Sequence, residues 1–148
     1  MIPLSVPNMC GDELENLKEC IDTGWLSTSG KYVEIFEKKM SAFVGSKHAI
    51  GCMNGTAALH VSLRLLGVEP ADEVIVPSLT FISPVHAIIY NFASPVFMDC
   101  DDYYNLDVGK TMDFIKNETY FENGSSYNKK SKKKIAAIIP IHVWGNAI

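Results

Sequence analysis

The fold is decided by the stretch "NGTAALHVSLRLLGVEPADEVIVPSLTFISPVHAI", residues 54–88. It opens with a turn of small residues and runs directly into a helical pattern over 56–66. A short apolar run follows at 72–77, and a second helical pattern covers 81–92. A helix, a short apolar strand and a further helix in this order are typical of a parallel sheet with helices on its faces.

The pattern continues on both sides of this stretch. Further short apolar runs at 48–52, 94–99 and 134–144 predict strands, and a weaker helical pattern lies at 108–115. Two amphipathic helices precede them and are predicted to end at Gly24 and Gly45. Their apolar faces are formed by Leu14, Leu17 and Ile21 in the first helix and by Val33, Phe36, Met40 and Phe43 in the second. The class is therefore α/β, with a mostly parallel sheet flanked by helices.

Composition narrows the range of functions. Hydrophobic residues make up 47% of the 148 residues, and the net charge is −4. No apolar run is long enough to cross a bilayer, so we expect a soluble cytoplasmic protein without a membrane partner. The acidic balance argues against nucleic-acid binding, which normally needs a basic surface. The four cysteines lie far apart without CxxC spacing, and this predicts neither a zinc site nor a disulfide framework.

The turn before the first helix of the opening stretch predicts either an anion site or a simple helix cap. Gly55, Thr56 and Ala57 leave backbone amides unhindered at the positive end of a helix, where phosphate groups commonly bind. Alternatively, Asn54 or Thr56 caps the helix and nothing more. The sequence contains neither GxGxxG nor GxxxxGK[ST], so a phosphate here belongs to neither a classical dinucleotide fold nor a P-loop.

The segment after the 72–77 strand is a second candidate region. Thr80 and Phe81 follow Pro77, at the carboxyl edge of the predicted sheet, where open α/β sheets bind ligands. Phe81 is either a core residue or a partner for a planar ring, which it would stack against with about 0.5–1.5 kcal/mol beyond area burial. The Asn-Gly pair at 123–124 predicts a projecting hairpin or loop within 120–134.

An acidic cluster offers an alternative of another class. Asp99, Asp101 and Asp102 follow the 94–99 strand, and carboxylates there could hold a divalent metal that bridges to a nucleotide-sugar diphosphate, as in a metal-dependent glycosyltransferase. The competing interpretation is a solvated strand end with a turn cap.

Four segments together resemble the DegT/StrS group of pyridoxal-phosphate-dependent sugar aminotransferases, which have fold type I. They are "DTGWLSTSGKYVEIFEKKMSAFVG", the opening stretch, "SPVFMDCD" and "IIPIHVWGN", and they occur in the family's order. The start "IPLSVPNM" and the segment before residue 135 are most similar to enzymes that aminate nucleotide-linked 4-keto-6-deoxy-N-acetylhexosamines.

The resemblance implies a cofactor, pyridoxal 5'-phosphate (PLP), and two substrates, glutamate and a nucleotide-linked keto sugar. It implies a role in precursor synthesis for cell-surface polysaccharides or glycans, and a homodimer in the full-length form. It assigns Gly55, Thr56 and Ala57 to the cofactor phosphate and Phe81 to the pyridine ring. On the substrate side it implies the residues Trp25, Ser27, Thr28, Thr80 and His142.

The resemblance also implies that the chain is an amino-terminal part of the catalytic domain. Residues 1–148 correspond to the first part of the large domain, with an arm and first helix over 1–30. The family's Schiff-base lysine and the carboxylate for the pyridine nitrogen lie beyond "HVWGN", so we expect no catalytic residue here and no activity of the isolated chain. A third interpretation is a non-catalytic fragment that associates with another chain.

Overall fold

The computed structural model describes residues 2, 3, 5–145 and 147, and its contacts divide the chain into two compact units, Met1–Gly51 and Cys52–Ile148. None of the helices in this described part combines the length and hydropathy that a bilayer-spanning segment needs.

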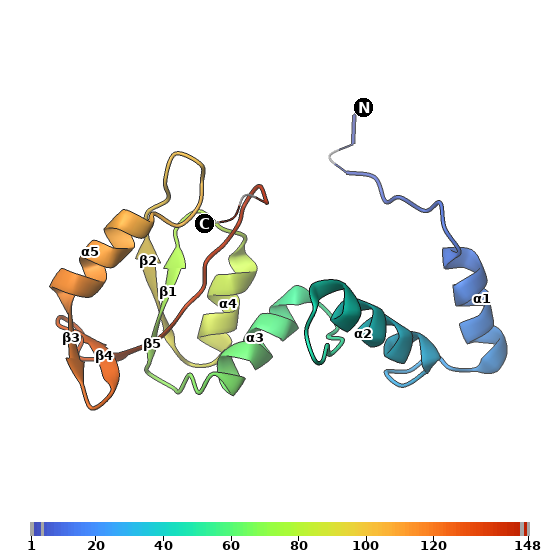
Figure 1. Ribbon diagram of the computed structural model, residues 1–148, viewed down its shortest axis with the longest axis horizontal. Coiled ribbons are helices and arrows are strands. Elements are labelled where there is room, and N and C mark those ends of the chain that lie inside the picture. The colour runs from blue at the N-terminus through green and yellow to red at the C-terminus, as the bar shows by residue number, and fades with distance from the viewer. Residues whose placement is uncertain (1, 4, 146, 148) are drawn as a thin grey trace. The chain divides into compact units, whose positions relative to one another are not determined.

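The first unit consists of two helices, α1 (Glu13–Thr23) and α2 (Lys31–Val44), joined by a loop over 24–30 (Figure 1). Gly24 and Gly45 end them in the left-handed conformation, with φ of 73° and 69°, so the predicted helix ends are confirmed. Among the described residues of these helices none is buried, and Phe43 of the predicted apolar face is 88% exposed. Apolar packing within the unit therefore does little to hold the two helices together.

The predicted strand at 48–52 is wrong. This segment has no regular secondary structure, and Ile50 is 82% exposed. A strand exists only where a neighbour completes its hydrogen-bond ladder, and none of the described strands pairs with this segment. The apolar run is real, but it has no partner here.

The second unit is an α/β layer structure with one five-stranded sheet in the order β2-β1-β5-β4-β3. Strands β2, β1 and β5 are parallel, while the β3–β4 hairpin continues the sheet in antiparallel pairing. This confirms the predicted class. The elements are α3 (Gly55–Leu65), β1 (Glu73–Pro77), α4 (Ile82–Tyr90), β2 (Ser94–Met98), α5 (Val108–Glu118), β3 (Thr119–Glu122), β4 (Ser125–Asn128) and β5 (Lys134–Ile138).

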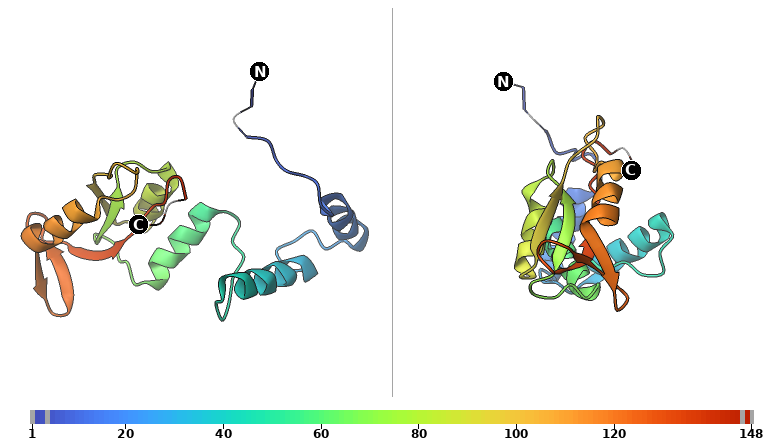
Figure 2. Two further views of the ribbon diagram at one scale, coloured as in Figure 1. Left: turned by 45° about the horizontal axis from the view of Figure 1, so that its top comes forward. Right: turned by 90° about the vertical axis from the view of Figure 1, so that its left-hand side faces the viewer.

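The core of the second unit lies on both faces of β1. Successive strand residues point to opposite faces, so Val74 and Val76 pack against α3 and α4 while Ile75 packs on the side of α5. All three are completely buried. Figure 2 shows α4 and α5 on opposite sides of the sheet. A strand that is covered on both faces needs an uninterrupted apolar sequence, and this explains the run at 74–77.

Two strand predictions need correction at the other side of the sheet. The hairpin turns at Asn123 and Gly124, whose φ values of 48° and 80° suit the Asn-Gly pair, but it does not project freely because β4 pairs with β5. β5 ends at Ile138 instead of continuing to residue 144. Pro140 has no amide hydrogen to donate to a neighbouring strand, so the ladder stops near it.

The parallel strands place a topological switch point between β1 and β5. The chain leaves β1 through α4 and returns as β2 on one side, whereas β5 pairs with the other side of β1. At such a point the loops after the two strands diverge and leave a crevice outside their carboxyl ends. The loop after β1 carries Thr80 and Phe81, and the loop after β5 carries His142.

Candidate functional site

The head of α3 is the first candidate region. Asn54 is its N-cap: its Oδ1 accepts a hydrogen bond from the Ala57 amide at 2.9 Å, and its carbonyl oxygen accepts one from the Ala58 amide at 3.1 Å. The structure therefore shows the helix cap. The cap is bonded to the Ala57 amide, which is one of the amides predicted to hold a phosphate. Within the described residues, the amides of Gly55 and Thr56 make no such bond, as expected for the first turn of a helix.

The space beside Gly55 is open. A Cβ atom added at Gly55 would meet no atom within 4 Å. Beside the turn lies a shallow hollow of about 410 Å³, lined by Asn54, Thr56, Ala57, His60 and Tyr90. The Tyr90 ring lies edge-on to the His60 ring at 6.0 Å between centroids. The head of α3 can thus be reached by a small anionic group from outside.

Thr80 and Phe81 lie between β1 and α4. Phe81 is the N-cap of α4 in an extended conformation, and its side chain is 77% exposed, so it is not a core residue. The Thr80 hydroxyl oxygen is buried, yet it makes no hydrogen bond to any of the described residues. A buried hydroxyl without a partner costs about 1–3 kcal/mol, so the Thr80 hydroxyl is available to bond to a polar group of a ligand.

His142 lies four residues beyond the end of β5 and is exposed. Its carbonyl oxygen accepts a hydrogen bond from the Gly145 amide at 3.1 Å, which closes the turn that contains it. Thr80, Phe81 and His142 thus share the carboxyl edge of the sheet. No hydrogen bond or ring contact joins them to the α3 turn in the part of the chain that the structure describes.

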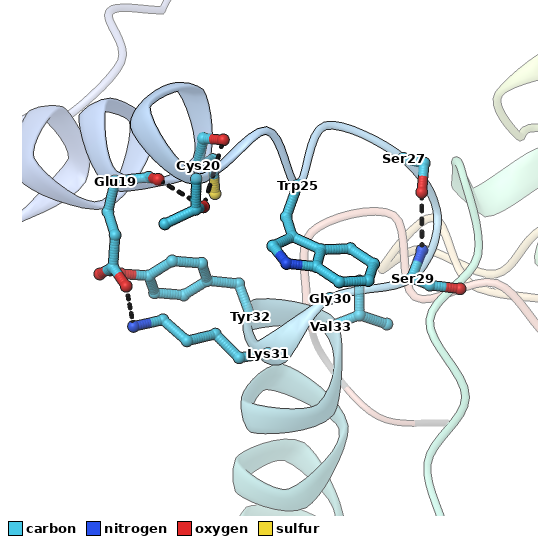
Figure 3. Close-up of a pocket in the computed structure, with 10 residues that line it drawn as sticks. Glu19, Cys20, Trp25, Ser27, Ser29, Gly30, Lys31, Tyr32 and Val33 are labelled. Carbon is cyan, nitrogen blue, oxygen red and sulfur yellow. Dashed lines mark hydrogen bonds and ion pairs between the residues drawn. The ribbon is translucent and has the colours of Figure 1, made fainter.

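The loop of the first unit forms a second candidate region, which is a pocket of about 340 Å³ between the end of α1 and the start of α2 (Figure 3). Two of the predicted substrate residues, Trp25 and Ser27, line it, whereas Thr28 does not. The Trp25 side chain is 60% exposed. The remaining lining residues are Glu19, Cys20, Thr23, Ser29, Gly30, Lys31, Tyr32 and Val33.

One wall of this pocket is a polar cluster around Glu19. Its carboxylate forms an ion pair with Lys31 through Oε1 and accepts a hydrogen bond from the Tyr32 hydroxyl at Oε2, 2.7 Å away. The Tyr32 oxygen also lies 2.9 Å from Asn16 Oδ1. The hydrogen bond from Lys31 lowers the pKa of Glu19, with a further contribution from Tyr32, and the same bond raises the pKa of Lys31.

The sequence carries no signal for the Glu19 cluster. Its members are twelve and thirteen residues apart, so neither helical nor strand spacing relates them, and single charged residues on a helix are usually solvated. The loop length over 24–30 determines that the end of α1 meets the start of α2, and this emerges only from the folded chain.

The acidic cluster after β2 is engaged in local contacts. Asp99 forms an ion pair with Lys110 at 2.7 Å, and Asp101 Oδ1 accepts hydrogen bonds from the amides of Tyr103 and Asn105, both at 2.9 Å. These are the bonds of an acidic turn cap. Across the described residues, no group of three or more His, Cys, Asp or Glu side chains is placed to hold a metal ion. The geometry therefore favours a structural role for the cluster.

Comparison with known proteins identifies the family to which this chain belongs. The family model described as the DegT/DnrJ/EryC1/StrS aminotransferase family matches residues 7–148. The chain belongs to this family. A curated member, GDP-perosamine synthase of Caulobacter vibrioides, is 39% identical over 145 residues, which are 97% of this chain and 35% of that protein. The chain thus spans about a third of the length of the relatives it matches.

Solved structures of the aminotransferase family have the same fold. A DegT/DnrJ/EryC1/StrS aminotransferase from Brucella abortus matches with a TM-score of 0.78 and 32% identity, over 91% of this chain and 34% of that one. NtdA from Bacillus subtilis, whose structure contains the bound cofactor PMP, matches with a TM-score of 0.73 and 27% identity, over 93% and 28%. The α/β layers and the parallel strands are therefore those of the aminotransferase fold.

Proposed function

We propose that this chain contributes the phosphate-binding corner and the substrate-side loop of a PLP-dependent aminotransferase. In this proposal the enzyme moves an amino group from glutamate to a nucleotide-linked 4-keto-6-deoxy sugar, in the synthesis of precursors for cell-surface polysaccharides or glycans, in the cytoplasm. The observation that carries it is the head of α3, where the Gly55 and Thr56 amides make no hydrogen bond within the described residues and a Cβ atom at Gly55 would meet no atom within 4 Å. Membership of the aminotransferase family and similarity to a GDP-perosamine synthase support the substrate class.

The residues present fit PLP on chemical grounds. A phosphate group needs hydrogen-bond donors at a positive site, and the Gly55 and Thr56 amides with the Thr56 hydroxyl meet that need. The buried Thr80 hydroxyl, which has no partner among the described residues, can bond to a polar group brought by the ligand. The exposed Phe81 ring offers an apolar face for a heteroaromatic ring.

Each residue has a distinct part in this proposal. Thr56 and Gly55 hold the phosphate and so fix the distance between the cofactor and the sheet edge. Phe81 orients the ring by stacking and excludes water from one of its faces. Ala57 contributes by its small size, since its amide is bonded to Asn54. Bound PLP supplies an electron sink that lets an amino group pass between an amino acid and a ketone.

The substrate side of the proposal is the loop with Trp25, Ser27 and Thr28, together with Thr80 and His142. We expect the whole enzyme to be a homodimer. We also expect that none of the lysines in these 148 residues carries the cofactor, because none has the sequence context that the resemblance requires. Borohydride reduction of the chain with PLP, followed by mass spectrometry of its peptides, tests this. A pyridoxyl group on one defined lysine would contradict the expectation.

Equilibrium dialysis of the chain with PLP, with and without inorganic phosphate as competitor, tests the cofactor proposal. We expect Phe81→Ala to weaken PLP binding about two- to tenfold, which corresponds to the ~0.5–1.5 kcal/mol of a lost ring stack. Thr56→Val is expected to weaken it as well and to reduce competition by phosphate, because the hydroxyl donor is lost.

The matched controls are Phe121→Ala on β3, where the ring is 75% exposed, and Ser62→Ala on the same helix as Thr56. Neither should change PLP binding. Equal losses in Phe81→Ala and Phe121→Ala would mean that PLP binds nonspecifically to exposed rings, and the proposed site would be wrong.

A further inference from the structure

We propose that Glu19 is the positioning residue of the 24–30 loop: its carboxylate holds the start of α2 against the end of α1 and so fixes how Trp25 and Ser27 meet a ligand. The ligand we assign to this loop, a nucleotide-linked sugar, rests on the proposed function above. The positioning role itself rests on the geometry of the first unit alone.

The first argument is that the described residues of this unit provide no other strong constraint between α1 and α2. The helices α1 and α2 contain no buried residue among those described, so apolar packing leaves their mutual orientation weakly defined. The bonds within the loop are short-range, such as the Leu26 amide to the Gly24 carbonyl at 3.1 Å. Such contacts shape a turn, but they do not fix the helices that flank it.

The second argument is that one side chain on α1 makes two bonds to α2 across the loop. Glu19 Oε1 pairs with Lys31 and Oε2 accepts from Tyr32, so a single carboxylate on α1 is bonded to the first two residues of α2. An isolated exposed ion pair contributes little, but a shared carboxylate with two charge-assisted bonds is a small network. Tyr32 adds a contact to Asn16 at 2.9 Å, one turn earlier on α1.

The third argument is the position of this network relative to Trp25. The Glu19, Lys31 and Tyr32 side chains form one wall of the 340 Å³ pocket, and Trp25 and Ser27 lie on its other side (Figure 3). A change in the spacing of the two helices therefore changes the pocket width and the exposure of the indole. The loop is suited to grip a planar or sugar ring only while the network is intact.

Trp25 itself reports on this role. The chain contains two tryptophans, so Trp144→Phe leaves Trp25 as the single indole fluorophore. In that background we expect Glu19→Gln to shift the Trp25 emission maximum and to raise its acrylamide quenching. The matched control is Asp22→Asn, which breaks the 2.6 Å pair with Lys18 on the same helix without affecting any bond across the loop. It should leave both signals unchanged.

A pH titration separates positioning from a general loss of structure. The groups bonded to the Glu19 carboxylate are Lys31 and Tyr32 from α2, and Asn16 on its own helix contacts the Tyr32 hydroxyl. Because its partners lower the pKa of Glu19 below the ordinary 4.5, the Trp25 signal should stay constant down to that pH and change as pH falls through the lowered value. Glu19→Gln should lack this transition. A transition of the same size in Glu19→Gln would overturn the proposal.

Binding of GDP, followed by quenching of Trp25, connects the network to the ligand. We expect Glu19→Gln to bind GDP about two- to fivefold more weakly. Tyr32→Phe, which keeps the Lys31 pair, should give a smaller loss. If the unaltered chain does not bind GDP, the ligand assignment is wrong, while the emission and pH results still decide the positioning role. If Glu19→Gln matches the unaltered chain in every signal, Glu19 positions nothing.

Discussion

Replacing Asn54 by aspartate separates the two interpretations of the α3 turn, because it changes charge without changing shape. Asn54 caps α3 through its Oδ1, which accepts from the Ala57 amide at 2.9 Å. Asparagine and aspartate are equally good N-caps, and a carboxylate near the helix start gains about 0.3–1 kcal/mol from the helix dipole. If α3 is only capped, Asn54→Asp keeps or slightly raises stability and changes nothing else.

If the turn binds an anion, the same substitution should weaken that binding. Asn54 lines the hollow beside Thr56, so a carboxylate there lies near any phosphate held by the Gly55 and Thr56 amides. At roughly 5 Å, two unit negative charges repel by about 0.8 kcal/mol in bulk water and about 3.3 kcal/mol at an effective dielectric constant near 20. PLP affinity should therefore fall at least about fourfold in Asn54→Asp.

The assay has two readouts. Thermal unfolding followed by circular dichroism gives stability, and equilibrium dialysis with PLP gives affinity, each compared with Asp107→Asn. Asp107 is the corresponding N-cap of α5, where its Oδ1 accepts from the Lys110 amide at 2.9 Å, so this control removes a charge at a different helix start. It should not change PLP affinity. Equal PLP affinities in Asn54→Asp and the unaltered chain would refute an anion site at the head of α3.

Three further outcomes are expected elsewhere in the second unit. Ile75→Ala should destabilise the protein by about 2–5 kcal/mol in urea unfolding, because Ile75 is completely buried, and a loss below about 1 kcal/mol would contradict the packing described. Thr80→Val should leave stability unchanged or raise it by up to about 1 kcal/mol, because it removes a buried hydroxyl that has no partner among the described residues. A clear loss of stability would show that the hydroxyl is bonded. The hydrogen bond that Lys110 donates to the Asp99 carboxylate raises the pKa of Lys110 above its ordinary 10.5. The stability from this pair is therefore complete below pH 10.5 and is lost as pH rises through the raised value, and Asp99→Asn should abolish this alkaline dependence.

The second unit could be predicted well from sequence because its signals are local and strong. Residues 74–77 are apolar throughout and buried, and only a strand covered on both faces suits such a run. In the first unit, the helix ends at Gly24 and Gly45 were also predictable, because glycine adopts the left-handed conformation most easily. The hairpin follows from Asn123 and Gly124 in the same way, although its pairing with β5 does not.

The failures of prediction share one cause, which is dependence on a partner segment. Residues 48–52 have the composition of a strand, but composition does not supply the neighbouring strand that a ladder needs. The run at 134–144 is apolar to its end, yet Pro140 stops the pairing soon after Ile138. The Glu19 network joins residues twelve and thirteen positions apart, and no periodic pattern marks such a pair.

The α3 turn shows why capping and anion binding need not exclude each other. A helix has four amides without intrahelical partners at its start, and one capping side chain satisfies only one or two of them. Asn54 accepts the Ala57 amide, and this fixes the first turn in a geometry in which the Gly55 and Thr56 amides have no hydrogen-bond partner among the described residues. The cap therefore orders the remaining donors before an anion binds. Binding then does not include the entropy cost of ordering the turn.

At the switch point of the sheet, the buried strand β1 likewise fixes the loop that follows it. β1 is completely buried along Val74, Ile75 and Val76, so its position is fixed by packing, whereas Thr80 and Phe81 just beyond it are held by the strand but contribute little to the core. The exposure of Phe81 costs the protein apolar burial that a core phenylalanine would provide. Since the strand that carries the loop is rigid, the ring keeps its place without that burial. Substitutions at Phe81 should therefore alter ligand binding far more than stability, and those at Ile75 should do the reverse.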